Sequence, residues 1–134
     1  MEKFYQSLTA FGAAVITYLF GGWSALLGIL LVFVITDYIT GVTAAGKESK
    51  LSSSIGMWGI GKKVMIFLIV AIAYLIDQAL GTATIIRDAA IYFYLANEVI
   101  SILENAGRIG VPLPPILIKA IALLKAKSEV KLDE

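Results

Sequence analysis

The stretch that decides the fold is "VFVITDYITGVTAAGKESKLSSS", residues 32–54. It begins as a continuous apolar run and continues into a polar segment with lysines and a cluster of serines. One carboxylate, Asp37, lies inside the apolar run, and Gly41 follows about one helical turn later. An aspartate at the centre of a membrane helix costs about 2.5–3.5 kcal/mol on insertion scales. The stretch therefore predicts the end of a membrane helix whose acid is protonated, hydrogen-bonded or in contact with water.

The composition of the whole chain favours a membrane protein. Of its 134 residues, 59% are hydrophobic and 16% are charged. Average soluble domains have about 45–50% apolar residues, even counting glycine, and about 25% charged residues. A chain this short cannot bury so much apolar surface in one core, so lipid is the expected solvent for the excess.

The residues that are missing exclude several kinds of chemistry. The chain has no cysteine and no histidine, which excludes disulfides, thiolate nucleophiles, the usual zinc sites and histidine acid–base catalysis. Its net charge of +1 does not suggest a nucleic-acid partner. We therefore expect no enzyme, no catalytic residue, no cofactor and no metal site.

Apolar segments predict three to four transmembrane helices. A span needs about 20 apolar residues, and residues 23–45, 64–80 and 84–103 are the clearest segments. Residues 4–20 would reach only about 25 Å as a helix, so they form either a fourth span or a helix at the membrane interface. Residues 115–128 predict an amphipathic helix in the cytoplasm or on the inner leaflet. We expect one all-α membrane domain over residues 1–134.

Basic residues predict the orientation of the chain. The positive-inside rule places the segment between the spans 23–45 and 64–80 in the cytoplasm, together with the C-terminus. The short connection before residue 84 is poor in basic residues and is expected outside. The topology determinants are Lys47, Lys50, Lys62 and Lys63.

Two carboxylates have the same predicted depth in the membrane. Asp37 lies about 4.5 Å to the cytoplasmic side of the centre of its span, and Glu98 holds a similar place in residues 84–103. Polar residues around Glu98 recur at helical spacing, so this side faces another helix or an aqueous lumen. For Asp37, a packing hydrogen bond and a place in a pore remain equally open. The candidates for lining a pore or an oligomer contact are Asp37, Gly41, Tyr94, Asn97, Glu98, Ser101 and Asn105.

A second polar pair is expected at the outer face. Asp77 lies near the outer end of residues 64–80, and Arg87 lies near the outer end of residues 84–103. Because the connection between these two segments is short, we expect an ion pair that helps to close the hairpin.

With these residues in place, the chain resembles the bacteriophage holin family that also includes the clostridial toxin-secretion holins. The resemblance rests on "TDYITGVTAAGKESKLSSSIGMWGIGKKV" (residues 36–64), on "YLANEVISILENAGRIGVPLPP" (residues 94–115), and on the lysine-bearing helix after the prolines. It implies a multi-pass protein of the bacterial cytoplasmic membrane that forms homo-oligomers in lipid and opens pores or lesions. Endolysin release with cell lysis, or toxin export, would follow without stable binding of the endolysin or toxin.

The alternative is a small proton-coupled multidrug exporter that acts as a dimer. Short spans and a buried Glu98 would suit such a transporter, because a carboxylate can exchange protons for a cationic substrate. An exporter requires residues 4–20 to span the membrane, and it should confer drug resistance instead of lysis.

Overall fold

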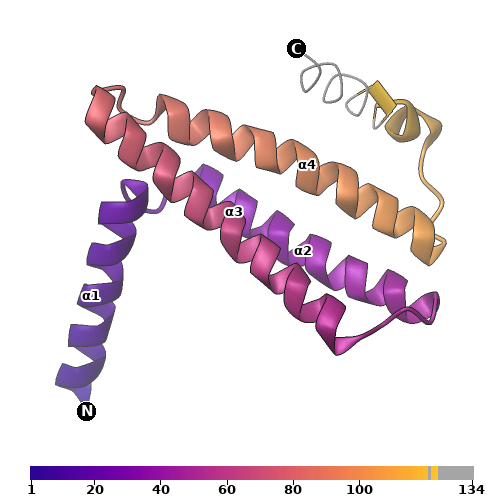
Figure 1. The fold of residues 1–134 in the computed structure, drawn as a ribbon, viewed down its shortest axis with the longest axis horizontal. Helices are drawn as coiled ribbons and strands as arrows, with labels where there is room; N and C mark the ends of the chain where they lie inside the picture. The colour runs from indigo at the N-terminus through magenta and orange to yellow at the C-terminus, as the bar shows by residue number, and fades with distance from the viewer. Residues whose placement is uncertain (121, 124–134) are drawn as a thin grey trace. The chain divides into compact units, whose positions relative to one another are not determined.

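A computed structural model of the chain describes residues 1–120 and 122–123. The long helices are α1 (Glu2–Phe20), α2 (Ala25–Lys47), α3 (Ser53–Leu80) and α4 (Ile85–Ile109), as Figure 1 shows. Residues 115–120 and 122–123 are also helical, and the described residues contain no strand. The predicted all-α fold is thus confirmed. Residues 121 and 124–128 of the expected C-terminal helix lie outside the described residues, so its full extent stays a prediction.

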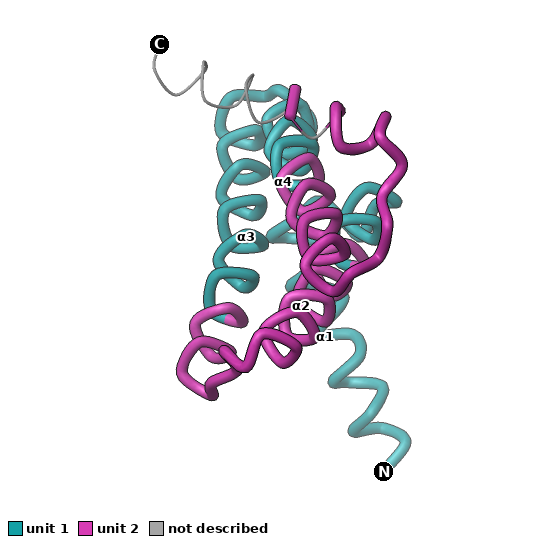
Figure 2. Tube along the Cα trace, turned by 90° about the vertical axis from the view of Figure 1, so that its right-hand side faces the viewer, with its two compact units in different colours: residues 1–31, 61–94 teal, residues 32–60, 95–134 magenta. Residues whose placement is uncertain are grey.

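Two compact units divide the chain, and α2, α3 and α4 each contribute to both (Figure 2). Unit 1 comprises Met1–Leu31 and Gly61–Tyr94, and unit 2 comprises Val32–Ile60 and Leu95–Glu134. Each unit is therefore built from segments that are distant in sequence. The expected single domain over residues 1–134 stays a prediction.

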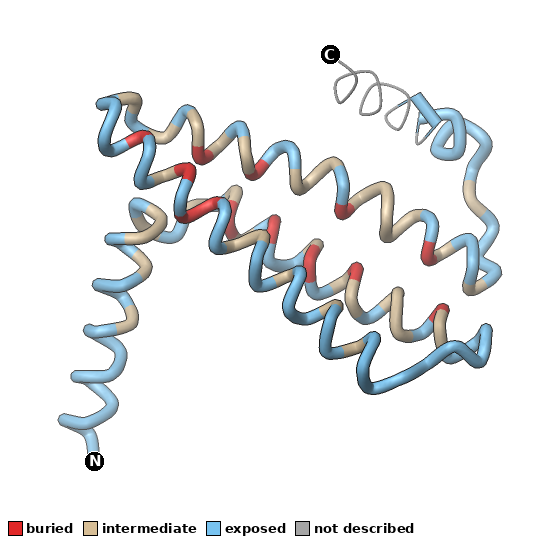
Figure 3. Tube along the Cα trace, viewed as in Figure 1, coloured by how far each residue is buried: buried red, intermediate tan, exposed pale blue. Residues whose placement is uncertain are grey.

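Two of the described helices, α2 and α3, are long and apolar enough to cross a membrane. Both helices have many exposed residues (Figure 3). Several of these are large and apolar, such as Ile35 and Ile39 on α2 and Leu68 and Ile72 on α3. Extended apolar surface of this kind marks contact with lipid or with a partner. The number of spans beyond these two helices stays a prediction.

Helix α3 begins well before the predicted start at residue 64. Ser52 caps it, because its hydroxyl accepts the N–H of Ile55 at 3.2 Å. Glycines in the first turns of α3 make room for Tyr38 of α2. The Tyr38 hydroxyl donates to the carbonyl of Gly56 at 3.3 Å, and a Cβ on Gly59 would lie 3.4 Å from the Tyr38 ring. Two of the predicted loop lysines, 62 and 63, consequently lie within α3.

Some other helix ends also differ from the prediction. Helix α2 begins at Ala25, two residues late, because the Ser24 hydroxyl accepts the N–H of Leu27 at 3.2 Å. Helix α4 continues past residue 103 to Ile109 and ends where Gly110 adopts φ +105°. Helix α1 begins two residues earlier than expected and ends, as predicted, at Phe20.

Candidate functional site

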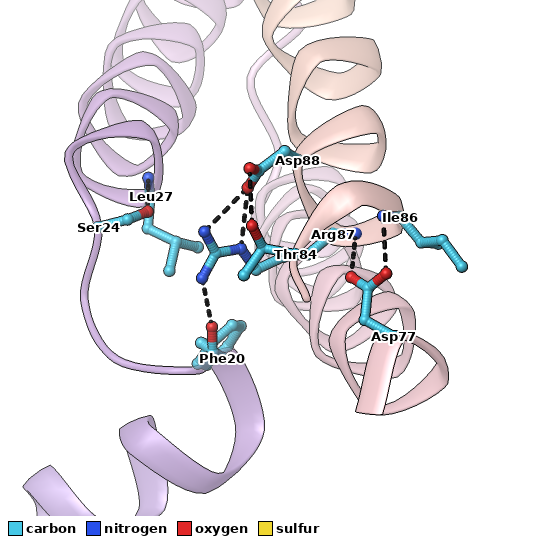
Figure 4. A network of polar contacts seen from close by, with 8 residues as sticks. All are labelled: Phe20, Ser24, Leu27, Asp77, Thr84, Ile86, Arg87 and Asp88. Atoms are coloured by element: carbon cyan, nitrogen blue, oxygen red, sulfur yellow. Dashed lines mark hydrogen bonds and ion pairs between the residues drawn. The ribbon is translucent and has the colours of Figure 1, made fainter. Parts of the chain in front are cut away.

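Unit 1 contains a polar cluster at the turn between α3 and α4, which we call the hairpin cluster: Asp77, Thr82, Thr84, Arg87 and Asp88 (Figure 4 shows all but Thr82). The Asp77 side chain is 0% exposed. Its carboxylate accepts the backbone N–H of Ile86 at 2.9 Å and that of Arg87 at 2.8 Å. These N–H groups belong to the first turn of α4, and the N–H groups of a first turn have no carbonyl acceptor within their own helix. Asp77 of α3 therefore acts as the cap of α4.

The guanidinium of Arg87 points away from Asp77. Its Nε donates to Asp88 Oδ1 at 3.0 Å, and its Nη2 lies 2.9 Å from the same oxygen. Its Nη1 donates to the backbone carbonyl of Phe20 at 2.6 Å. The structure thus brings Asp77 and Arg87 together, but through the Arg87 backbone instead of the expected side-chain ion pair. Both Asp77 oxygens accept backbone N–H donors, and the guanidinium is engaged by Asp88 and by the Phe20 carbonyl.

Unit 2 contains a second polar cluster where α2 meets α4, which we call the seam cluster: Asp37, Thr40, Lys47, Glu48, Asn105 and Arg108. At its buried end the Asn105 amide donates to Asp37 Oδ1 at 2.9 Å and to the Thr40 hydroxyl at 3.0 Å. Asp37 is 7% exposed and Asn105 is 6% exposed. A Cβ on Gly41 would lie 3.5 Å from the Asn105 amide nitrogen, so Gly41 lies against α4 at this point.

The exposed end of the seam cluster joins the last turns of the same two helices. The Arg108 side chain pairs with Glu48, with Nε and Oε1 at 3.0 Å, and its Nη1 donates to Asn105 Oδ1 at 3.2 Å. Lys47 Nζ donates to the carbonyl of Ile109 at 2.7 Å, which satisfies a free acceptor at the end of α4. The hydrogen bond from Arg108 holds the pKa of Glu48 below its ordinary value.

The contacts of the seam cluster show that Asp37 and Glu98 do not lie at the same level along α4, contrary to the prediction. Asp37 lies level with Asn105, whereas Glu98 lies about 10 Å earlier along α4. Glu98 is 4% exposed, so both acids are buried within the single chain. Tyr94 and Ser101 are partly buried and Asn97 is exposed. Whether these residues line a pore or an oligomer contact stays a prediction.

Several of the structural partners have weak sequence signals. Thr84 and Asp88 are four residues apart after a turn, a spacing that suits a contact on one helix face. The glycines at 56 and 59 are three apart, which permits close approach of a neighbour such as Tyr38. Backbone partners, such as the Phe20 carbonyl, leave no signal in the residue type. Among the described residues, no group of carboxylates could hold a metal ion.

The chain is similar in sequence to known proteins. The bacteriophage holin family matches residues 14–126 of the chain. A protein named probable holin, from Bacillus phage phi105, is 34% identical over 117 residues, which cover 87% of this chain and 86% of the phage protein. An uncharacterized protein of Halalkalibacterium halodurans is 46% identical over 130 residues, covering 93% and 96% of the two chains. An uncharacterized 14.9 kDa protein from the nagH 3′ region of Clostridium perfringens is 43% identical over 112 residues, covering 83% and 85%.

No solved structure matches the chain. The family match nevertheless covers most of the sequence, including α2, α3, α4 and both polar clusters. The resemblance noted from the sequence is therefore confirmed, and this membrane protein belongs to the bacteriophage holin family.

Proposed function

We propose that the chain acts as a holin, a non-enzymatic protein that oligomerises in a bacterial cytoplasmic membrane and opens pores or lesions there. The family match over residues 14–126 carries this proposal, and the phage relative named probable holin supports it. The two apolar helices long enough to cross a membrane suit the same role. Opening would let an endolysin reach the cell wall, or let a toxin leave the cell, without stable binding of either protein.

The buried polar residues suggest how opening is controlled. Among the described residues, every buried side-chain nitrogen or oxygen has a hydrogen-bond partner, and the Asn105 amide supplies one to Asp37. In our proposal these groups satisfy one another in the closed state. In the open state water takes over, and the polar side chains face a lumen. Hydration of the carboxylates then favours the open state, so the acids bias an equilibrium between two states. The residues proposed to line the lumen or an oligomer contact are Asp37, Gly41, Tyr94, Asn97, Glu98, Ser101 and Asn105.

Expression in a bacterium tests the pore. We expect entry of a membrane-impermeant dye once the protein has accumulated, and lysis when an endolysin is produced at the same time. A catalytically dead endolysin serves as the control. Dye entry should be the same with it, but the cells should not lyse, because their cell wall is not cleaved. Intact membranes after strong accumulation in the membrane fraction would contradict the proposal.

Charge-removing variants test the role of the acids. Asp37→Asn and Glu98→Gln preserve shape and hydrogen bonding, so both variants should insert and oligomerise but admit dye later than the parent. Glu98→Gln should have the larger effect, because more polar residues surround Glu98 on its helix. Thr43→Val, at an exposed position of the same helix as Asp37, is the control and should not change the timing. Normal timing in the double acid variant would mean that the acids serve only packing.

A further inference from the structure

Helix α1 is held in unit 1 mainly at one end. None of its described residues, 2–20, is buried. Its large apolar side chains, including Phe4, Leu8, Phe11 and Tyr18, are exposed. The last turn is different, because the Phe20 carbonyl accepts a hydrogen bond from Arg87, 67 residues later in the chain. What fixes the direction of α1 is therefore concentrated near residue 20.

The bond from Arg87 to Phe20 is strong and specific. The last carbonyls of a helix receive no N–H donor from the helix itself, so they are free to accept an outside hydrogen bond. A cation at this end also interacts favourably with the helix dipole. Arg87 is only 6% exposed, and its Nη1 lies 2.6 Å from the Phe20 oxygen. Hydrogen bonds from a charged donor are roughly twice as strong as neutral ones. A single side chain thus joins α1 to the beginning of α4.

The hairpin cluster orients this side chain through a chain of contacts that Figure 4 shows. The Thr84 hydroxyl donates to Asp88 Oδ2 at 3.1 Å, and Asp88 Oδ1 in turn holds the Arg87 guanidinium. Thr84 directly precedes α4 and would ordinarily cap its N–H groups. Asp77 caps them instead, so the Thr84 hydroxyl is available for Asp88.

Two glycines form the backbone directly after Phe20. Gly21 and Gly22 have φ values of +76° and +98°, which residues with a Cβ rarely adopt. Gly21 lies against the ring of Tyr74, where a Cβ would collide, whereas a Cβ on Gly22 would meet nothing within 4 Å. These two glycines join α1 to the connection that leads into α2, and they permit more than one direction of α1.

We propose that Arg87 is a latch for α1. While its guanidinium holds the Phe20 carbonyl, α1 keeps one direction relative to the α3–α4 turn. When this bond opens, Gly21 and Gly22 allow α1 to swing. Opening need not leave a buried charge alone, because Arg87 is also paired with Asp88. Arg87 would control the position of α1 whether or not the protein opens pores.

Distance measurements in lipid test the latch. The chain has no cysteine, so spin labels can be attached to cysteines placed at two exposed positions, Ala14 in α1 and Gln78 in α3. Pulsed electron paramagnetic resonance on the full chain in lipid nanodiscs should give one narrow distance for the parent. Arg87→Ala should lose this narrow distance and show a broad distribution. Arg87→Lys should be intermediate, because an ammonium group lacks the planar fork that reaches Asp88 and Phe20 together.

Two controls separate release of α1 from a damaged hairpin. Labels at Gln78 and Ala89, both exposed and on either side of the turn, should keep the parent distance in Arg87→Ala. Arg108→Ala removes an exposed arginine from unit 2 and should leave the Ala14–Gln78 distance unchanged. A narrow parent distance in Arg87→Ala, with the hairpin intact, would overturn the latch.

A third variant decides the case in which Arg87→Ala also alters the hairpin. Thr84→Val keeps Arg87 and Asp77 but removes the hydroxyl that orients Asp88. Broadening of the Ala14–Gln78 distance in this variant, with a normal Gln78–Ala89 distance, would support the latch. A parent-like Ala14–Gln78 distance would overturn it.

Discussion

At Asp77, one carboxylate of α3 caps the helix that follows. This placement is possible because the turn between α3 and α4 is short, and because Gly81 ends α3 with φ +71°. The Thr82 hydroxyl donates to Asp77 Oδ1, so the residues of the turn itself hold the cap in position. A side chain with two acceptor oxygens and no donor is required here.

Replacing Asp77 should destabilise the hairpin in a defined order. Asp77→Asn keeps one acceptor but turns an amide N–H toward a backbone N–H, and Asp77→Ala leaves both backbone donors without a partner. We expect the melting temperature in detergent, followed by circular dichroism, to fall from the parent to Asp77→Asn and further to Asp77→Ala. The exchange Asp77→Arg with Arg87→Asp should bring no recovery, because arginine cannot accept these bonds. Recovery would show that a side-chain ion pair holds the turn.

On the scale of elements, α2 uses different faces for its two neighbours in unit 2. Tyr38 lies on the first turns of α3, while Asp37 and Gly41 lie against α4. Adjacent helix positions point about 100° apart, so Asp37 and Tyr38 naturally serve different partners. The two contacts differ in kind, since one is an aromatic ring on glycines and the other is a row of hydrogen bonds.

A matched pair of glycine variants tests the contact between α2 and α3. In a helix interior, glycine to alanine usually stabilises by about 0.8–1 kcal/mol. Gly61→Ala should show this gain, because a Cβ there would meet nothing within 4 Å. Gly56→Ala should gain less or lose stability, since its Cβ would lie 3.3 Å from the Tyr38 hydroxyl. Equal melting temperatures for the two variants would contradict the close approach of Tyr38.

The Glu48–Arg108 pair should make the junction of α2 and α4 sensitive to acid. The pKa of Glu48 is lowered in the folded chain by the hydrogen bond from Arg108, so the pair stabilises the fold above about pH 4.5, the ordinary value for glutamate. This contribution is lost as the pH falls through the lowered pKa. It is small, because both side chains are partly exposed.

Glu48→Gln tests this pH dependence. The difference in melting temperature between the parent and Glu48→Gln should be present at pH 7 and should vanish at pH values below the lowered pKa of Glu48. Lys62→Gln removes an exposed charge outside the Glu48–Arg108 pair, and it serves as the control for a change of net charge. A difference that stays constant with pH would show that the pair does not depend on ionised Glu48.

On the scale of the whole molecule, the arrangement of basic residues predicts a topology. Lys47 is the last residue of α2 and Lys50 lies in the short connection to α3, whereas Lys62 and Lys63 lie inside α3. From residue 63 to the end of α3 the helix still rises about 26 Å, which approaches the thickness of the hydrocarbon core. The expected cytoplasmic side for this connection and for the C-terminus therefore needs no change.

Labelling of introduced cysteines tests this topology in intact cells without open lesions. Cysteines at Ser53 and Ser128 should resist an impermeant thiol reagent, because both positions are expected in the cytoplasm. A cysteine at Ala83, exposed in the turn between α3 and α4, should react from outside and is the positive control. The predicted orientation would be contradicted if Ser53→Cys and Ser128→Cys reacted with the reagent while Ala83→Cys was protected.

Local information in the chain was sufficient for the protein class and for most of its elements. Long apolar runs indicate a membrane protein and helices whatever their neighbours are, and the blocks around Asp37 and Glu98 were enough to identify the family. Ends of helices were less predictable, as α3 shows. The predicted start of this helix was residue 64, whereas α3 begins at Ser53. Tyr38, which lies on the glycines at 56 and 59 in the first turns, is distant in sequence.

Only the packed chain showed which polar groups meet. Asp37 was recognised as unusual, but its contact with Asn105 depends on the rotation and register of α2 against α4. Asp77 and Arg87 were expected to be neighbours, yet the carboxylate binds backbone N–H groups and the guanidinium binds Asp88 and the Phe20 carbonyl. A backbone partner is the same for every residue type, and the direction of a side chain turns by about 100° per residue of helix. For that reason a shift of one residue in the register between two helices would change every such contact. The apolar pattern of the sequence is compatible with either register and therefore could not predict the contacts.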